Sequence, residues 1–234
     1  ALTWIECSAN QLTSLDVSNN TALITLDSGN NKLTALDVSN NTALTYMHCP
    51  DNQLTSLDVS KNTALAILTL QNNQLTSLDV SKNTALTQLW VQRGNQLTSL
   101  DVSKNTALTF LACGSNKLTS LDVSKNTALT KLYCKNNLLT SLDVSTNTAL
   151  TQLSVSGNQL TSLKMRNGVK NSLTTFVIHT NPSLTCIEVL DPAWATANWV
   201  SVSGGNIEMD AGVTFSVICG GTDLTTWHVA TTGS

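Results

Sequence analysis

A heptapeptide, LTSLDVS or a close relative, recurs along most of the chain at an almost constant spacing. It begins at seven positions, namely Leu12, Leu33, Leu54, Leu75, Leu97, Leu118 and Leu139. A degenerate copy, LTSLKMR, begins at Leu160. Successive copies lie 21 residues apart, except for one interval of 22 residues that contains Gly94. A period of this length predicts a solenoid, in which each unit buries its apolar residues only against its neighbours.

Each unit contains two similar halves, and both are patterned like short strands. The first half reads LTSLDVSKN at 54–62, and the second reads TALTYMHCPDNQ at 42–53. The second half matches the leucine-rich repeat pattern L-x-x-L-x-L-x-x-N/C. Alternation along a strand turns residues 4 and 6 of a half inward and residues 3, 5 and 7 outward. We therefore predict a mostly β leucine-rich repeat solenoid with two short strands per 21-residue coil. The strands form two parallel sheets across a thin Leu/Val core, with little or no helix in the repeats.

An asparagine ends each half, and we expect its side-chain amide to satisfy backbone groups that the turn exposes. Neighbouring copies would then form ladders. The first row, from the second halves, comprises Asn31, Asn52, Asn73, Asn95, Asn116, Asn137 and Asn158. The second row, from the first halves, comprises Asn20, Asn41, Asn62, Asn83, Asn105, Asn126 and Asn147.

The array over residues 1–190 resembles the short, nested leucine-rich repeats of the IRREKO class, which are common in surface proteins of Bacteroidetes. It is also distantly similar to internalin arrays. The resemblance implies a solenoid that is secreted or held on the bacterial cell surface, with a concave sheet that binds a ligand. Residues 1–11 read as a bare second half-repeat, so an N-terminal cap is expected to be absent.

The periodicity stops at Leu190, and the following residues have a different composition. The segment 191–219 concentrates bulky apolar groups, namely Trp194, Trp199, Ile207, Met209, Phe215 and Ile218. Because a terminal coil exposes its core, we expect residues 191–234 to form a C-terminal cap and a tail. The tail at 220–234 is expected to be either an added edge strand or a partly ordered end.

Six cysteines divide into two groups. Four share the inward sixth position of the second half, and we expect them to be buried free thiols: Cys7, Cys49, Cys113 and Cys134. Cys186 and Cys219 remain, and the run that contains them resembles the end cap of the same bacterial family, where two cysteines look paired. We predict a disulfide between them, and hence an oxidising compartment.

Enzymatic motifs are missing from the sequence. It contains no nucleophile elbow, phosphate-binding Walker loop, HExxH or paired CxxC, so we expect no catalysis, metal or cofactor. The net charge of −3 argues against nucleic-acid binding, and no apolar run approaches the ~18 residues of a transmembrane segment. His48 is expected to be a surface residue near Asp27 and Thr69.

Each first half carries an aspartate, and together these form an acidic row: Asp16, Asp37, Asp58, Asp79, Asp101, Asp122 and Asp143. We expect lysines such as Lys61, and hydroxyls such as those of Ser56 and Ser60, to offset repulsion within the row. A calcium-binding ladder is the sharper alternative, but lysine within the motif opposes it. The regular Thr/Ser/Asn lattice also raises ice binding, which charged Asp and Lys fit poorly.

The outward positions of the second halves vary while the rest of the unit repeats. We expect a partner-binding face there, comprising Trp4, Tyr46, His48, Ile67, Gln88, Trp90, Gln92, Arg93, Phe110, Lys131, Tyr133 and Gln152. Trp90, Phe110 and Tyr133 fall in successive coils and should form one patch, since contiguous exposed apolar side chains mark binding sites. The alternative is that these aromatic rings only cover one another. Gly94 should form a small bulge that pushes Arg93 outward.

The sequence therefore favours a monomeric, non-enzymatic recognition or adhesion module that binds a protein. A glycan-binding module is the first alternative, because exposed Trp and Tyr can stack on sugars. A structural spacer without its own ligand is the second.

Overall fold

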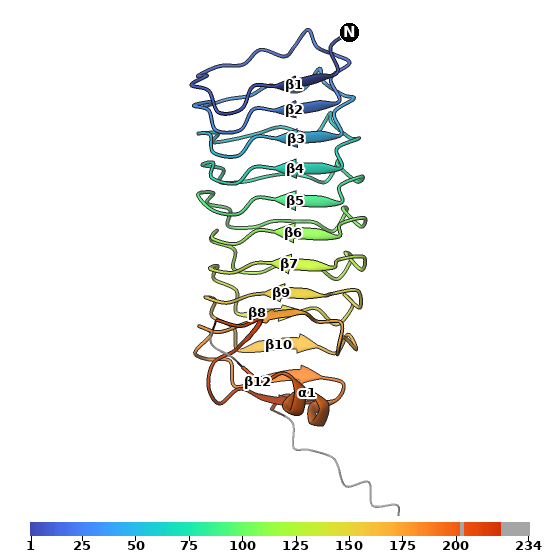
Figure 1. Cartoon of the computed structure of the whole chain (residues 1–234), viewed down its shortest axis with the longest axis vertical. Coiled ribbons are helices and arrows are strands. Elements are labelled where there is room, and N and C mark those ends of the chain that lie inside the picture. The colour runs from blue at the N-terminus through green and yellow to red at the C-terminus, as the bar shows by residue number, and fades with distance from the viewer. Residues whose placement is uncertain (202–203, 221–234) are drawn as a thin grey trace, which may run out of the picture.

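The protein is a parallel β-solenoid, as its computed structural model shows for residues 1–201 and 204–220. The coils stack along the long axis of the molecule, with their second-half strands one above another (Figure 1). These strands form a ten-stranded parallel sheet. In order they are β1 (Trp4–Glu6), β2 (Thr25–Asp27), β3 (Tyr46–His48), β4 (Ile67–Thr69), β5 (Gln88–Trp90), β6 (Phe110–Ala112), β7 (Lys131–Tyr133), β9 (Gln152–Ser154), β11 (Thr175–Val177) and β13 (Ile207–Glu208).

A second parallel sheet has four strands, all towards the C-terminal end of the described chain. They are β8 (Ser141–Asp143), β10 (Ser162–Met165), β12 (Cys186–Val189) and β14 (Thr214–Ser216). The two predicted sheets are thus confirmed. The second sheet has fewer strands than predicted, because only some of the coils contribute a strand to it. Earlier first halves run without strand pairing.

Charge explains where the second sheet begins. In the earlier coils each aspartate of the acidic row faces another aspartate, and like charges directly opposite one another destabilise strand pairing. The degenerate copy replaces aspartate by Lys164, which lies in register with Asp143. The amide of Val144 then donates to the carbonyl of Lys164 over 2.9 Å, and the ladder continues to β12.

The core is a column of inward residues that repeats from coil to coil. In most strands of the large sheet the central residue is fully buried and the first residue is half-exposed, as the alternation predicted. Leu44, Met47 and Cys49 are each 0% exposed. Each coil contributes one such layer, so the core has no single centre and extends along the whole described solenoid.

The first asparagine row satisfies the turn completely. Asn73 Nδ2 donates to the carbonyls of Cys49 (2.9 Å) and Leu70 (3.2 Å), and Asn73 Oδ1 accepts from the amide of Leu54 (3.0 Å). One side chain therefore joins backbone groups of two successive coils. Equivalent bonds recur at the other members of the row, which confirms the predicted ladder.

The second row is satisfied on one side only. Asn83 Nδ2 donates to the carbonyls of Val59 and Asn62, and both distances are 2.9 Å. Its Oδ1 is buried and has no hydrogen-bond partner in the described part of the protein. The same holds for the amide oxygens of Asn41, Asn62, Asn105, Asn126 and Asn147. The sequence pattern made the two rows look equivalent, and the structure separates them.

The last coil is covered by packed aromatic side chains next to helix α1 (Pro192–Asn198). Asp191 caps the helix by accepting a hydrogen bond from the amide of Trp194. Trp199 is 5% exposed and packs against Phe176 and Phe215, with ring centroids 5.0 and 5.7 Å away. These contacts shield the end of the core from water.

Cys186 and Cys219 form a disulfide, as predicted. For a loop of this length the chain-entropy treatment gives a stabilisation of about 4 kcal/mol. The predicted boundary at residue 190 stays a prediction. Residues 221–234, which hold most of the tail, lie outside the described residues. No helix within the described ranges is long and apolar enough to cross a membrane.

Candidate functional site

The variable face lies on the large sheet, where register fixes which outward side chains are neighbours. Trp90 is the Cα partner of Thr69 on one side and of Ala112 on the other. Ala112 is in turn the partner of Tyr133. Two bulky rings therefore flank a single methyl group. Ala112 is 0% exposed although it points outward, because these rings cover it.

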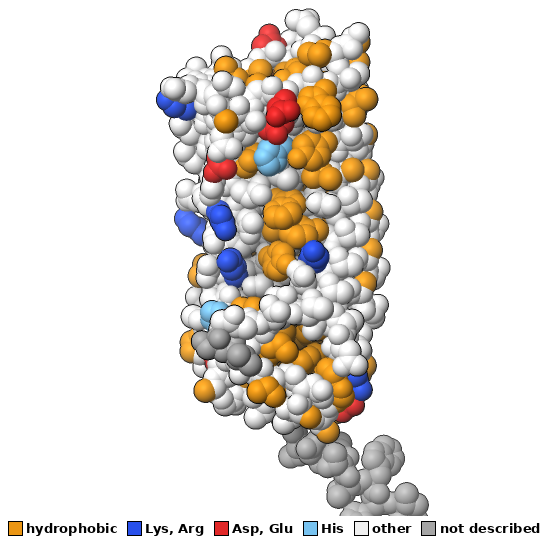
Figure 2. Space-filling view, viewed as in Figure 1, with side chains coloured by type: hydrophobic (Ala, Val, Ile, Leu, Met, Phe, Trp, Pro, Cys, Tyr) orange, Lys and Arg blue, Asp and Glu red, His pale blue; other side chains and the backbone are white. Residues whose placement is uncertain are grey.

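Three aromatic rings from successive coils form one contiguous cluster, which we call the aromatic cluster: Trp90, Phe110 and Tyr133. The rings of Trp90 and Phe110 are stacked, with centroids 4.0 Å apart and planes at 18°. Tyr133 meets Phe110 edge-on, with centroids 5.5 Å apart. All three side chains remain partly exposed. In Figure 2 hydrophobic side chains gather over the middle of this face.

Neighbouring polar groups extend the aromatic cluster towards the C-terminal coils. The Tyr133 hydroxyl donates to Gln152 Oε1 in the next coil. Partial burial raises the pKa of Tyr133, so its hydroxyl stays a donor well above neutral pH. Lys131 is the Cα partner of both Phe110 and Gln152. Gln88, Lys131 and Gln152 thus line one edge of the cluster.

The N-terminal half of the face carries a second, smaller group. Tyr46 and His48 stack with ring centroids 6.3 Å apart, and His48 Nδ1 hydrogen-bonds the hydroxyl of Thr69. Desolvation, and then the charge of Asp27, raise the pKa of Tyr46. Ile67 lies between Tyr46 and Gln88 in register and connects this group to the aromatic cluster.

Trp4 lies apart from both groups, at the edge strand β1, and is 61% exposed. The twelve residues expected on the face therefore occupy one surface, but only those of β5 to β9 form a compact patch. A role in binding for any of them stays a prediction.

Gly94 and Arg93 form the irregular turn after β5. Most coils have one residue with positive φ at this point, such as Asn72 and Asn136, and Arg93 occupies that place with φ of 59°. Gly94 is the added residue, with φ of 64°. The insertion leaves the Arg93 side chain exposed beside the variable face. Asn95 Oδ1 still accepts from the Leu75 amide over 3.0 Å, so the ladder is intact.

The acidic row has a local stabiliser. The backbone amide of Ser60 donates to Asp58 over 2.8 Å, and this bond, followed by that of the Ser60 hydroxyl, lowers the pKa of Asp58. The charge of Lys61 contributes less. The same amide-to-carboxylate bond recurs in six further coils. In the four motifs that carry a lysine, those of Asp58, Asp79, Asp101 and Asp122, the serine bonds lower the aspartate pKa more than the lysine charge does. The described residues hold no group of three or more metal-ligating side chains.

The inward thiols are held neutral by burial. Desolvation raises the pKa of Cys49 to about 11 and that of Cys113 to about 12, and it raises the pKa of Cys134 well above its usual range. Cys7, in the first coil, is only partly buried. None of the four thiols forms a disulfide, as predicted. Such thiols pack as small apolar groups.

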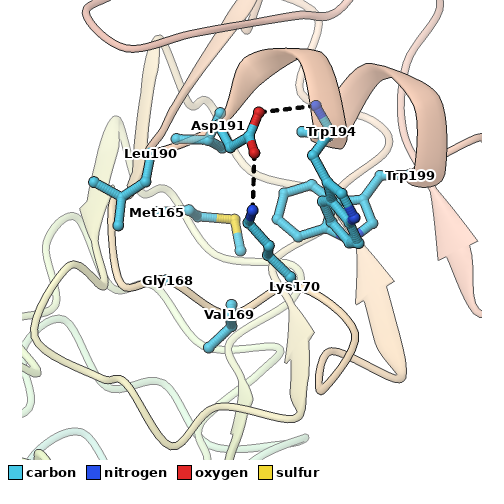
Figure 3. Close-up of a pocket in the computed structure, with 10 residues that line it drawn as sticks. Met165, Gly168, Val169, Lys170, Leu190, Asp191, Trp194 and Trp199 are labelled. Atoms are coloured by element: carbon cyan, nitrogen blue, oxygen red, sulfur yellow. Dashed lines mark hydrogen bonds and ion pairs between the residues drawn. The ribbon is translucent and has the colours of Figure 1, made fainter.

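A cavity of about 10 Å³ lies where α1 meets the last coils (Figure 3). Lys170 spans its mouth, with Nζ 2.8 Å from the Asp191 carboxylate and 5.7 Å from the Trp194 ring centroid. The space holds about one water molecule, so it is a packing gap and not a ligand site. No sequence pattern pointed to this contact, because Lys170 and Asp191 belong to no repeated motif.

Comparison with known families supports the fold. A family described as Leucine Rich repeat matches residues 29–46. A search of curated proteins finds no match.

Solved structures resemble the chain over most of its described length. The functional domain of InlJ from Listeria monocytogenes, described as including a cysteine ladder, is 42% identical, with a TM-score of 0.67 over 80% of this chain and 44% of that one. The Leptospira interrogans protein LIC12759 is 24% identical, with a TM-score of 0.63 over 82% of this chain and 49% of that one. The L. monocytogenes internalin InlF is 20% identical, with a TM-score of 0.53 over 77% and 60% of the two chains.

The protein is thus a leucine-rich repeat solenoid with internalins among its structural neighbours. It spans less than half of the length of the InlJ domain and of the Leptospira protein. The likeness to the Leptospira protein and to InlF is a likeness of fold.

Proposed function

We propose that this protein is a non-enzymatic recognition module that binds a protein partner through the variable face, in the manner of an adhesin. The aromatic cluster is the observation that supports this most. The scaffold repeats almost unchanged from coil to coil, and three large rings are placed outward in three successive coils of it. Exposed Trp and Tyr with nearby Arg are the side chains that most often anchor protein interfaces.

The ring geometry favours a protein over a glycan. Sugar rings bind to open aromatic faces, but Trp90 and Phe110 cover one face of each other, and Tyr133 lies edge-on to Phe110. What remains outward is a ridged apolar surface with hydrogen-bonding groups at its edge. Such a surface suits apolar side chains of a partner.

The disulfide supports a secreted or cell-surface location, because disulfides persist in oxidising compartments. The nested 21-residue unit supports the narrower assignment to the Bacteroidetes class of repeats that the sequence resembles. Both assignments belong to the proposal.

Binding to cell monolayers tests the proposal. The purified chain is compared with a triple variant, Trp90→Ala, Phe110→Ala and Tyr133→Ala, and with a control in which Lys61, Lys82 and Lys104 become Ala. Trypsin treatment of the cells should abolish binding by the wild-type chain, whereas glycosidase treatment should leave it unchanged. The aromatic variant should bind at least tenfold more weakly, and the lysine control should bind normally.

Each alternative predicts a different pattern. Loss of binding after glycosidase alone would favour a glycan ligand, to be confirmed on a glycan array with Trp90→Ala. Binding at background level by all three proteins would favour a spacer without its own ligand, and equal binding above background would place the binding site outside the aromatic cluster. A wild-type chain that shifts ice growth would favour ice binding.

A further inference from the structure

The variable face is divided by charge along the axis of the solenoid. Between β1 and β9 its acidic groups lie in the first three coils, at Glu6, Asp27 and Asp51, and Glu208 on β13 is paired with His179. Its basic groups lie in the fifth and seventh coils, at Arg93, Lys131 and Lys135. Figure 2 shows blue side chains beside the central hydrophobic cluster and, nearer the N-terminal end, several red side chains with one pale blue and one blue.

The three cations surround the aromatic cluster. Lys131 is in register with Phe110 on one edge. Lys135 follows Tyr133 by two residues, and its stem crosses Gly114, where a Cβ would come within 3.1 Å of Lys135 Cγ. Arg93 follows Trp90 by three residues and is exposed in its left-handed turn. The cluster is therefore bounded by positive charge on both sides.

These cations have no acidic partner within the described ranges, 1–201 and 204–220. The ion pairs found there join Lys170 to Asp191 and His179 to Glu208, both near the C-terminal end. The acidic row differs, because the Ser60 amide donates a hydrogen bond to Asp58. Positive charge beside exposed rings, with no acidic partner among the described residues, is complementary to an anion that carries apolar groups.

From this arrangement we infer that the partner presents an extended acidic segment, with apolar side chains that pack on Trp90, Phe110 and Tyr133 and carboxylates that pair with Arg93, Lys131 and Lys135. The inference rests on the proposed function and specifies its partner. Coils in such a sheet are ~4.8 Å apart, so β5 to β7 span ~10 Å and match about three or four extended residues. The acidic first coils exclude a segment whose negative charge continues towards β1.

Three synthetic peptides test this chemistry against the wild-type chain by isothermal titration calorimetry. All are capped octapeptides with one Leu, one Phe and one Trp at the same positions, and the other five residues are Asp/Glu, Asn/Gln or Lys. The acidic peptide should bind at least tenfold more tightly than the neutral one, and the Lys peptide should bind most weakly. The preference should shrink as NaCl is raised from about 0.05 to about 0.5 M, because salt screens exposed charges.

Charge reversal then localises the effect. The variant Arg93→Glu, Lys131→Glu and Lys135→Glu should lose the acidic preference at least tenfold. The matched control Lys61→Glu, Lys82→Glu and Lys104→Glu changes the net charge by the same amount on turns outside the face, and it should keep the preference. Far-UV circular dichroism and thermal melting verify that both variants fold.

Several results would overturn the inference. It fails if the acidic and neutral peptides bind equally, if none binds, or if the control lowers affinity as much as the reversal. If the aromatic variant loses cell binding while the peptides show no acidic preference, the proposed function stands and only this inference falls. Sedimentation that reveals a dimer broken by reversal of Arg93, Lys131 and Lys135 would assign the face to a second copy instead.

Discussion

Asn73 and Asn83 offer a matched test of how the solenoid is held together. Both asparagines are buried in central coils, at 2% and 0% exposure, and both can be replaced by alanine. The side-chain volume lost is identical. The difference between the two variants therefore reports hydrogen bonding more than packing.

Asn73→Ala removes bonds that nothing else replaces. The Leu54 amide and the Cys49 carbonyl are bonded by this side chain and by no other group in the described structure, whereas the Leu70 carbonyl keeps a bond from Asn95. A buried polar group left without a partner costs ~1–3 kcal/mol. Two such groups at ~2 kcal/mol each predict a loss of about 4 kcal/mol in the free energy of unfolding.

Asn83→Ala should be milder. The carbonyls of Val59 and Asn62 each keep a backbone donor, the amides of Asn62 and Leu65 respectively. The two lost bonds cost ~1 kcal/mol each, and removal of the unpaired Oδ1 offsets about half of that, so the net loss is about 1 kcal/mol.

Urea denaturation followed by circular dichroism measures both losses, and an unchanged slope against urea would show that cooperative unfolding is retained. The reasoning is refuted if the two variants lose equal stability, or if Asn83→Ala loses more.

Three other predictions follow from local geometry. Hydrogen bonds from the serine two residues further along the chain lower the pKa of Asp79 and of other members of the acidic row, so these bonds stabilise the folded protein. This stabilisation is complete above the unfolded pKa of ~3.9 and is lost as pH falls through the lower pKa values of the folded state. A variant with Asn throughout the row should lose less stability than wild type between about pH 5 and about pH 2 in urea denaturation, and an equal loss would contradict this. Gly94→Ala should cost about 1–2 kcal/mol, because φ is 64° and a Cβ would lie 2.9 Å from Asn72 Cα; thermal melting without a decrease would count against the strained turn. Cys113 should resist a disulfide-exchange reagent in the native state while Cys7 reacts, since burial raises the pKa of Cys113 to about 12; equal labelling by mass spectrometry would disprove its protection.

The features that depend on repeat position were predictable from sequence. An inward sixth position specifies a buried thiol at Cys113 whatever the other coils contain, and an asparagine at the turn specifies the bonds of Asn73. The cap disulfide was also predictable, since Cys186 and Cys219 stand outside the repeated row.

The features that depend on geometry between coils were not. The second sheet begins where Lys164 faces Asp143, and a repeat pattern does not reveal which neighbouring carboxylates prevent pairing. The unpaired oxygen of Asn83 depends on the direction of the turn, and both asparagine rows look alike in sequence. The stacking of Trp90 on Phe110 is a choice of rotamer across a diagonal of the sheet, which spacing alone leaves open.

The added Gly94 has a consequence for how such a protein can change. The extra residue is absorbed within one left-handed turn, and Asn95 still bonds the preceding coil as its counterparts do. An insertion at this edge therefore stays local, and the strands on either side keep their register. Loops of different length could be grafted after any strand of the large sheet, which would make this edge a place where new specificities arise without refolding the solenoid.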